Sequence, residues 1–199
     1  MPSRKIKPNY TRAVVIVHGK SERCLVKFNC SNLHLSIKIE AKHKGNHSIQ
    51  ITSLNDYLKL SQFKNLSRFK NTYDINYDNK KKKLLDFKLF IIMDTDDCTE
   101  YQAKRFINKE MFKEHLLYDY IVPIYNTNNL EDVMIKCGIM TNRIENSKKG
   151  SYYTKVFPIN SKPLCNDTKA EVITLQKKLL NSNNTNLNEF IDYCLSLLK

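Results

Sequence analysis

The stretch Phe87–Asp97, Phe-Lys-Leu-Phe-Ile-Ile-Met-Asp-Thr-Asp-Asp, places an apolar run directly before three carboxylates. Its segment Leu89–Met93 is apolar without interruption, which is typical of a strand buried on both faces of a sheet. Open α/β sheets bind their ligands beyond the carboxyl ends of such strands. We therefore expect this strand at the centre of the fold and a functional site at its end.

Asp94 and Asp96 are two positions apart, so in an extended chain their side chains lean to the same side. Two carboxylates held together repel each other unless a cation lies between them, and Mg²⁺ is the common choice where phosphates are handled. The spacing therefore predicts a divalent ion, Mg²⁺ or Mn²⁺, with Asp97 either as a further ligand or at the start of the next helix. The alternative is a solvated acidic turn, because Asp is also an ordinary turn and N-cap residue.

A second apolar run, Ala13–Val17, is followed at 18–22 by His-Gly-Lys-Ser-Glu. Its β-branched residues predict another buried strand. Gly19 permits a sharp turn with positive φ, and Ser21 is expected to cap a helix with Glu22 in its first turn. Right-handed crossovers bring the ends of the two strands to the same edge of the sheet. We therefore expect the 18–22 turn to face the acids at 94–97.

The rest of the chain alternates between strand and helix patterns, which indicates an α/β sheet with helices on both faces. Further strands are expected at 33–39, 120–125 and 156–159, helices at 49–68, 99–117 and 130–139, and a polar loop at 42–47. Residues 1–12 are expected to form a basic arm, residues 13–160 the α/β domain, and residues 161–199 a C-terminal helical extension.

The charge balance favours a polyanionic partner. Lys and Arg number 33 against 20 Asp and Glu, a net charge of +13, which suits nucleic acid, with simple solubility as the alternative. No apolar run approaches the ~20 residues needed to span a bilayer, and the first residues lack an apolar signal region. We therefore expect a cytoplasmic protein without a membrane partner. The closing helices are candidates for contact with a second copy, as a homodimer, or with a partner protein.

Taken together, segments 15–22 (Val-Ile-Val-His-Gly-Lys-Ser-Glu) and 90–97 (Phe-Ile-Ile-Met-Asp-Thr-Asp-Asp) resemble the TOPRIM domain of topoisomerases, bacterial primases and OLD-family nucleases. The resemblance covers roughly residues 13–126. It is most like the stand-alone or OLD-like nucleases, because no primase or topoisomerase domain is attached. It implies a Rossmann-like, mostly parallel sheet and metal-dependent hydrolysis of phosphodiester bonds in DNA or RNA, in phage defence or RNA processing.

The family usually carries a Glu immediately before the glycine, where this chain has His18. OLD-like members have a second acid about four residues on, which Glu22 matches. The resemblance thus implies that Glu22, Asp94 and Asp96 are catalytic and hold the metal. His18 would join them as a ligand or general base, or it would mark a degenerate site. A catalytically degenerate module that binds nucleic acid or a protein is therefore the alternative function.

Basic and aromatic residues supply further candidates for contact with nucleic acid. Lys20 is expected to steady a phosphate oxygen, and Lys148 and Lys149 are candidates whose alternative is an ordinary surface loop. Tyr152 and Tyr153 could stack on unpaired bases or pack in the core. Glycosyltransferases and haloacid-dehalogenase-type phosphatases also use Asp-x-Asp. The former do not need the 18–22 turn, and the latter place the motif after their first strand.

Overall fold

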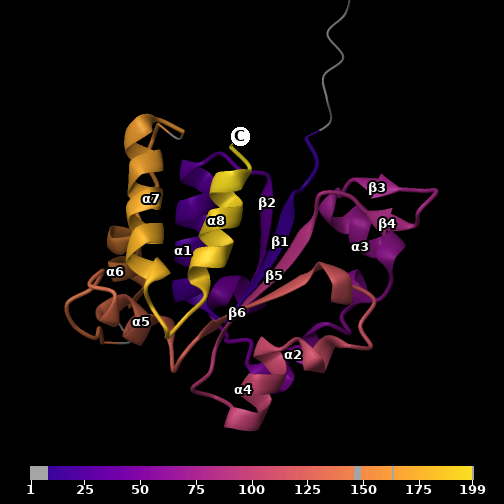
Figure 1. Cartoon of the computed structure of the whole chain (residues 1–199), viewed down its shortest axis with the longest axis horizontal. Helices are drawn as coiled ribbons and strands as arrows, with labels where there is room; N and C mark the ends of the chain where they lie inside the picture. The colour runs from indigo at the N-terminus through magenta and orange to yellow at the C-terminus, as the bar shows by residue number, and fades with distance from the viewer. Residues whose placement is uncertain (1–8, 146–148, 163, 199) are drawn as a thin grey trace, which may run out of the picture.

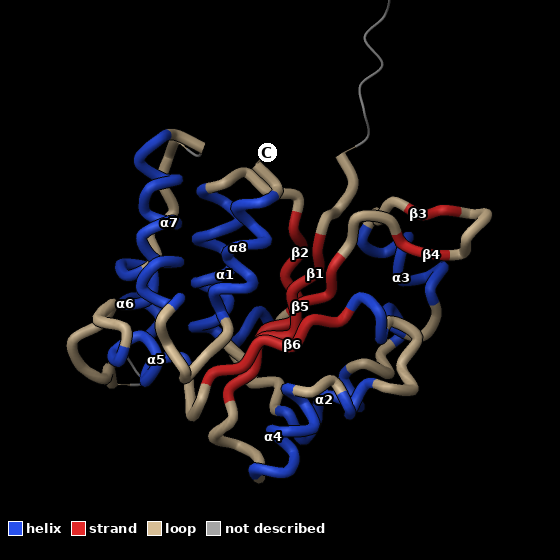
Figure 2. The backbone as a smooth tube through the Cα atoms, in the orientation of Figure 1, coloured by secondary structure: helices blue, strands red, loops and turns tan. Residues whose placement is uncertain are grey.

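The protein is described by a computed structural model that covers residues 9–145, 149–162 and 164–198. Its centre is a parallel four-stranded sheet with the strand order β2-β1-β5-β6. Helices cover both faces of this sheet (Figures 1 and 2), so the predicted α/β class is confirmed. The four strands are β1 (Ala13–Val17), β2 (Ile37–Glu40), β5 (Lys88–Asp94) and β6 (Ile121–Asn126).

The two central strands are the two apolar runs of the sequence. β1 pairs with β5 in parallel, and at its end Val17 lies opposite Ile92. Every residue of β1 is fully buried, as expected for a strand covered on both faces. Alternate side chains enter the two helical layers: Val15 and Val17 face one layer, and Val14 and Ile16 face the other.

The first helical layer includes the helices expected to form a C-terminal extension. Phe190 of α8 packs edge-on against Phe90 of β5, with ring centroids 5.2 Å apart. The hydroxyl of Tyr193 donates to the backbone oxygen of Arg12 at 2.7 Å. These closing helices therefore complete the core over the sheet. The layer contains α1 (Lys20–Asn32), α5 (Leu130–Lys136), α6 (Lys149–Val156), α7 (Asn166–Leu180) and α8 (Leu187–Ser196).

The second layer consists of shorter pieces around a cluster of aromatic side chains. Phe63 and Phe69 lie with ring centroids 5.7 Å apart, and Phe69 packs edge-on against Phe87 at 5.6 Å. The layer contains α2 (Leu54–Tyr57), α3 (Leu66–Tyr73), α4 (Glu100–Ile107) and the hairpin of β3 (Tyr77–Asp78) with β4 (Lys83–Leu84). Single 3₁₀ turns occur at Lys42–Gly45, Ile51–Ser53, Ser61–Phe63, Glu110–Phe112 and Tyr118–Tyr120.

Several predicted elements are shorter than expected because single residues leave the regular conformation. The helix predicted at 49–68 is broken at Leu60, whose ψ of 155° is extended. The helix predicted at 99–117 ends at Ile107, since Lys109 adopts a left-handed φ of 61°. His34, with φ 53°, delays the edge strand until Ile37. Among the described residues, no helix combines the length and apolar character required to cross a bilayer.

The strand predicted at 156–159 is wrong, because α6 occupies the start of this range. Tyr153 and Phe157 are four positions apart, so they lie on one helical face, and their rings stack with centroids 6.0 Å apart. Phe157 also contacts Phe28 of α1 at 5.8 Å. Of the four residues of this apolar run, Val156 ends the helix, Phe157 is buried just after it, and Pro158 and Ile159 are exposed, so the run does not form a strand.

The connectivity of the sheet creates a topological switch point between β1 and β5. From β1 the chain passes through α1 to β2 on one side, and β5 then starts on the other side of β1 and leads through α4 to β6. The two crossovers thus leave the centre of the sheet in opposite directions. Such a switch point is where open α/β sheets bind ligands, at the carboxyl ends of the strands.

Candidate functional site

Two buried carboxylates meet at the switch point. Asp94 is the last residue of β5 and is 6% exposed, and Glu22, in the first turn of α1, is 2% exposed. Burial raises the pKa of Asp94 well above its usual range, and the negative charge of Glu22 raises it further. The structure therefore brings the two segments together at one end of the sheet.

Glu22 is held by the start of its own helix. Its Oε2 accepts a hydrogen bond of 2.8 Å from the backbone N–H of Gly19, the N-cap residue of α1. The positive φ expected at Gly19 is wrong, because the residue is extended, with φ −156°. The expected cap at Ser21 is also wrong, since the helix already starts at Lys20. Glu22 closes the first turn like the acid of a capping box, which fixes the direction of its carboxylate.

Asp94 is held by a polar network that the sequence motifs do not reveal. Its Oδ1 accepts a hydrogen bond of 2.9 Å from Nδ2 of Asn126, at the end of β6. The same oxygen accepts a second hydrogen bond of 3.1 Å from the backbone N–H of Leu130. Asn126 is fully buried, and its Oδ1 lies 3.0 Å from the hydroxyl of Thr185. Two donors therefore orient one oxygen of Asp94. The only available sequence signal was the position of Asn126 at a strand end.

Asp96 lies at the mouth of the site. Its side chain is exposed, and its Oδ2 is 3.4 Å from Nδ2 of Asn129. The backbone N–H of Asp96 donates to the carbonyl oxygen of Asn128 at 3.1 Å, which ties the turn after β5 to the turn after β6. Asp96 also adds to the raised pKa of Asp94, as the smallest of its causes. It therefore belongs to the same acidic group, but on the solvent side.

His18 lies beside Asp97. Its Nδ1 is 3.8 Å from Oδ2 of Asp97, and both side chains are largely buried, with 15% and 12% exposed. Among the described residues, no hydrogen-bond partner is found for this nitrogen, whereas the backbone of Ile51 interacts with the carboxylate of Asp97. Burial raises the pKa of Asp97, and His18 and the Ile51 backbone oppose that rise. These polar atoms form a second pair next to the Glu22–Asp94 pair.

A loop that follows β2 forms one wall of the site. The backbone N–H of Ile49 donates to the oxygen of His18 at 2.8 Å. Gly45, with φ +91°, packs against the backbone of Lys20, where a Cβ would come within 3.1 Å of the Lys20 Cα. The loop therefore passes directly over the turn that carries Glu22. The sequence predicts a polar loop here but not where the loop lies, because the position of the loop depends on contacts with a distant segment.

Replacing Gly45 with Ala is expected to displace this wall. The left-handed conformation alone costs an L-residue about 1–2 kcal/mol, and overlap with the Lys20 backbone adds about 1–3 kcal/mol. Gly138→Ala is the matched control, because Gly138 has φ +63° but no atom within 4 Å of an added Cβ. Urea denaturation should show the larger loss of stability for Gly45→Ala. Equal losses in the two variants would contradict the close contact.

The predicted basic and aromatic contacts occupy different surroundings. Lys20 is exposed as the first residue of α1, and Lys148 lies outside the described residues. Lys149 starts α6, but its side chain lies outside the described part of the chain. Tyr153 is 1% exposed, so it packs in the core, while Tyr152 is half-buried. Burial raises the pKa of Tyr153, and among the smaller causes the charges of Glu22 and Asp94 also raise it.

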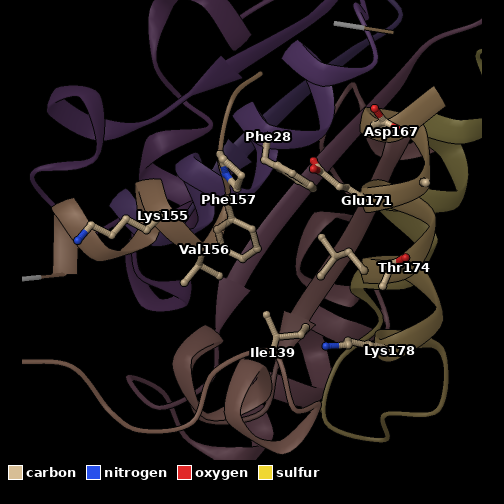
Figure 3. A pocket seen from close by; sticks show the side chains of 12 residues that line it. Phe28, Ile139, Lys155, Val156, Phe157, Asp167, Glu171, Thr174 and Lys178 are labelled. Carbon is tan, nitrogen blue, oxygen red and sulfur yellow. The ribbon is translucent and has the colours of Figure 1, made fainter. Parts of the chain in front are cut away.

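A hollow in the first helical layer lies apart from these residues. The cavity of about 520 Å³ is bounded by α1, α6 and α7, and its apolar floor includes Phe28, Val156 and Phe157 (Figure 3). Lys155 and Glu171 are among the charged residues that line it. None of the residues predicted for the site lines it, so the acidic group is not part of this cavity.

The donor set suits a hard divalent cation. A buried pair of like charges is costly unless a cation lies between them, and Mg²⁺ is usually held by one or two carboxylates with water and substrate phosphates. Glu22 and Asp94 supply such a pair, and Asp96 lies at its mouth. Within the described ranges, however, no group of three or more His, Cys, Asp or Glu side chains is already arranged around one point as metal ligands.

Comparisons with known proteins add little to this geometry. No protein-family model matches the sequence, and no curated protein matches it either. Among solved structures, the chain is similar to the C-terminal region of the Burkholderia pseudomallei OLD protein, with 13% identity and a TM-score of 0.36. That match covers 94% of this chain and 89% of the other. The residues of the site therefore carry the functional argument.

Proposed function

We propose that the protein is a metal-dependent nuclease that hydrolyses phosphodiester bonds in DNA or RNA, in the manner of TOPRIM nucleases. The observation that carries the proposal is the buried pair of Glu22 and Asp94 at the switch point of the sheet. Such a pair needs a cation, and the switch point is the place where this class of fold binds ligands. The net charge of +13 supplies the attraction for a polyanion.

Glu22 and Asp94 would hold Mg²⁺ or Mn²⁺, with Asp96 as a further ligand at the mouth. A bound divalent cation would activate water and neutralise charge on the scissile phosphate. The protein prepares this site before substrate arrives, because Asn126 and Leu130 fix one oxygen of Asp94. The same two hydrogen bonds also fix the direction of the other oxygen of Asp94. The side chain would therefore lose little conformational freedom when it binds the cation.

His18 and Lys20 would act on the substrate side. The Nδ1 of His18 lacks a hydrogen-bond partner among the described residues, so His18 could take a proton from an attacking water. Asp97, 3.8 Å away, would stabilise the resulting imidazolium ion. Lys20 is exposed two residues before Glu22 and could contact a phosphate oxygen.

The direct test is to incubate the purified protein with end-labelled RNA, single-stranded DNA and double-stranded DNA. We expect cleavage of at least one of these in Mg²⁺ or Mn²⁺ and none in EDTA. Intact substrates in both metals, over a range of protein concentrations, would overturn the proposal.

A catalytically degenerate module that binds nucleic acid is the second candidate. It is favoured by His18 at the position where the TOPRIM pattern has Glu, and by the lack of a ready-made group of three ligands among the described residues. It predicts that nucleic acid binds with the same affinity in Mg²⁺ and in EDTA and is never cleaved. Metal-dependent cleavage that is lost in a site variant would exclude it.

A further inference from the structure

The loop that walls the site has a basic outer surface. Lys42, His43, Lys44 and His47 are all exposed, while Gly45 in their midst is buried against the start of α1. The imidazole rings of His43 and His47 pack edge to face with centroids 4.8 Å apart. We refer to Lys42–His47 as the basic loop. Its side chains are exposed next to the turn that carries Glu22.

The backbone of the basic loop is held in one unusual shape. His43, Lys44 and Gly45 have successive left-handed φ angles of 48°, 59° and 91°. The first two are costly for residues with a side chain, and such strain is typically retained at functional positions. On the following segment, the hydrogen bond from Ile49 to His18 ties the loop to the end of β1. The loop therefore presents its basic side chains from a fixed position.

The charge of the basic loop is not neutralised by its neighbours. Among the described residues, no ion pair joins Lys42 or Lys44 to an acid. The nearest acid along the chain, Glu40, instead accepts hydrogen bonds from the hydroxyls of Tyr73 at 2.9 Å and Tyr57 at 3.2 Å. Exposed lysines without acidic partners are available to bind an external anion.

An acidic site that acts on a polyanion needs such a neighbour. The carboxylates of Glu22, Asp94 and Asp96 repel phosphates, so the backbone of a nucleic acid must be held by positive charge close by. The basic loop is adjacent, because a Cβ on Gly19 would lie 3.4 Å from Oε2 of Glu22 and 3.9 Å from Oγ of Ser48, the residue directly after the loop. The buried acids would hold the cation, and the lysines of the adjacent loop would hold the phosphates.

We propose that the basic loop is the surface that binds the phosphodiester backbone of the nucleic acid and holds it beside the acidic site. The inference rests on the proposed function for its substrate class. It assigns Lys42 and Lys44 as the principal phosphate contacts. His43 lies between them in the sequence, and His47 ends the loop. Lys20, on the segment under the loop, extends the same surface.

The test is the binding of a labelled single-stranded oligonucleotide in EDTA, measured by fluorescence anisotropy at several KCl concentrations. The variant is Lys42→Ala with Lys44→Ala. Two lost phosphate contacts should weaken binding at least about 10-fold at low salt and reduce the slope of log K against log [salt] by about 1.4, at roughly 0.7 per contact. The control is Lys80→Ala with Lys81→Ala, two exposed lysines in the β3–β4 hairpin, which Figure 1 places at the far end of the sheet.

The control pair should change the affinity less than about twofold, although it removes the same charge. Near-identical binding by wild type and the Lys42/Lys44 variant would overturn the inference, as would an equal loss in the control. Failure of the wild type to bind at low salt would also overturn it. Circular dichroism of both variants confirms that they are folded.

The same variants separate this inference from the proposed nuclease activity. If the wild type cleaves nucleic acid and the Lys42/Lys44 variant binds and cleaves equally well, only the basic loop is excluded. If the wild type never cleaves but the variant loses binding, the nuclease proposal fails and the basic loop is still the contact surface.

Discussion

Replacing Asp94 with Asn is expected to lower metal-dependent cleavage by at least about 100-fold, because even the partners of a metal ligand are worth about 10–100-fold. The Asn side chain is nearly isosteric, and its carbonyl oxygen can still accept from Asn126 and Leu130. Only the charge of the ligand is lost. The measurement is the initial rate on the best substrate in saturating Mg²⁺ or Mn²⁺.

Asp74→Asn is the matched control for this variant. Asp74 is exposed, and its backbone oxygen bonds to Thr11, ahead of β1 and away from the carboxyl ends of the strands. The control should cleave at the wild-type rate. If Asp94→Asn cleaves at the wild-type rate, Asp94 is not a residue of the catalytic site.

The same variant should be more stable than the wild type when metal is removed with EDTA. Folding raises the pKa of Asp94, mainly through burial and further through the charge of Glu22. The stability that Asp94 contributes is therefore fully present below its unfolded pKa of about 3.8 and is lost as the pH rises through its folded pKa. The variant escapes this loss, because an amide side chain does not ionise. Its advantage in thermal melting should therefore be small in acid and grow with pH, to about 0.5–2 kcal/mol.

Combining Asp94→Asn with Glu22→Gln is expected to give a strongly non-additive gain in stability. Either substitution alone relieves the repulsion between the two side chains, so the second adds little after the first. The double variant should fall short of the summed single effects by about 0.5–3 kcal/mol, in urea denaturation without metal. Side chains more than about 7–10 Å apart would give effects that add within about 0.5 kcal/mol. Additive effects would therefore contradict the charge interaction between Glu22 and Asp94.

The centre of the fold could be predicted from the sequence because its signals are local. The apolar runs Ala13–Val17 and Leu89–Met93 are too short for helices in these surroundings, and each is followed by polar residues. Parallel strands joined by right-handed crossovers then place Glu22 and Asp94 at the same edge. This step needs only the order of the elements and not their lengths, so it tolerates the errors at helix boundaries.

The support of the site could not be predicted, since it depends on contacts between distant segments. The bond from Asn126 to Asp94 joins residues 32 positions apart, and Thr185, which lies against Asn126, is 59 positions further on. The basic loop is placed by the packing of Gly45 on Lys20. A glycine in a polar stretch predicts a turn, but it does not indicate which surface the turn will cover.

The central claim is that Glu22 and Asp94, from two separate segments, hold one divalent cation. It is tested most directly by the anomalous difference map of a crystal soaked in Mn²⁺. We predict a peak between the carboxylates of Glu22 and Asp94 in the wild type, and its loss in Asp94→Asn crystals soaked in the same way. A map of the wild type with no peak at these two side chains, at a Mn²⁺ concentration that supports cleavage, would contradict the account.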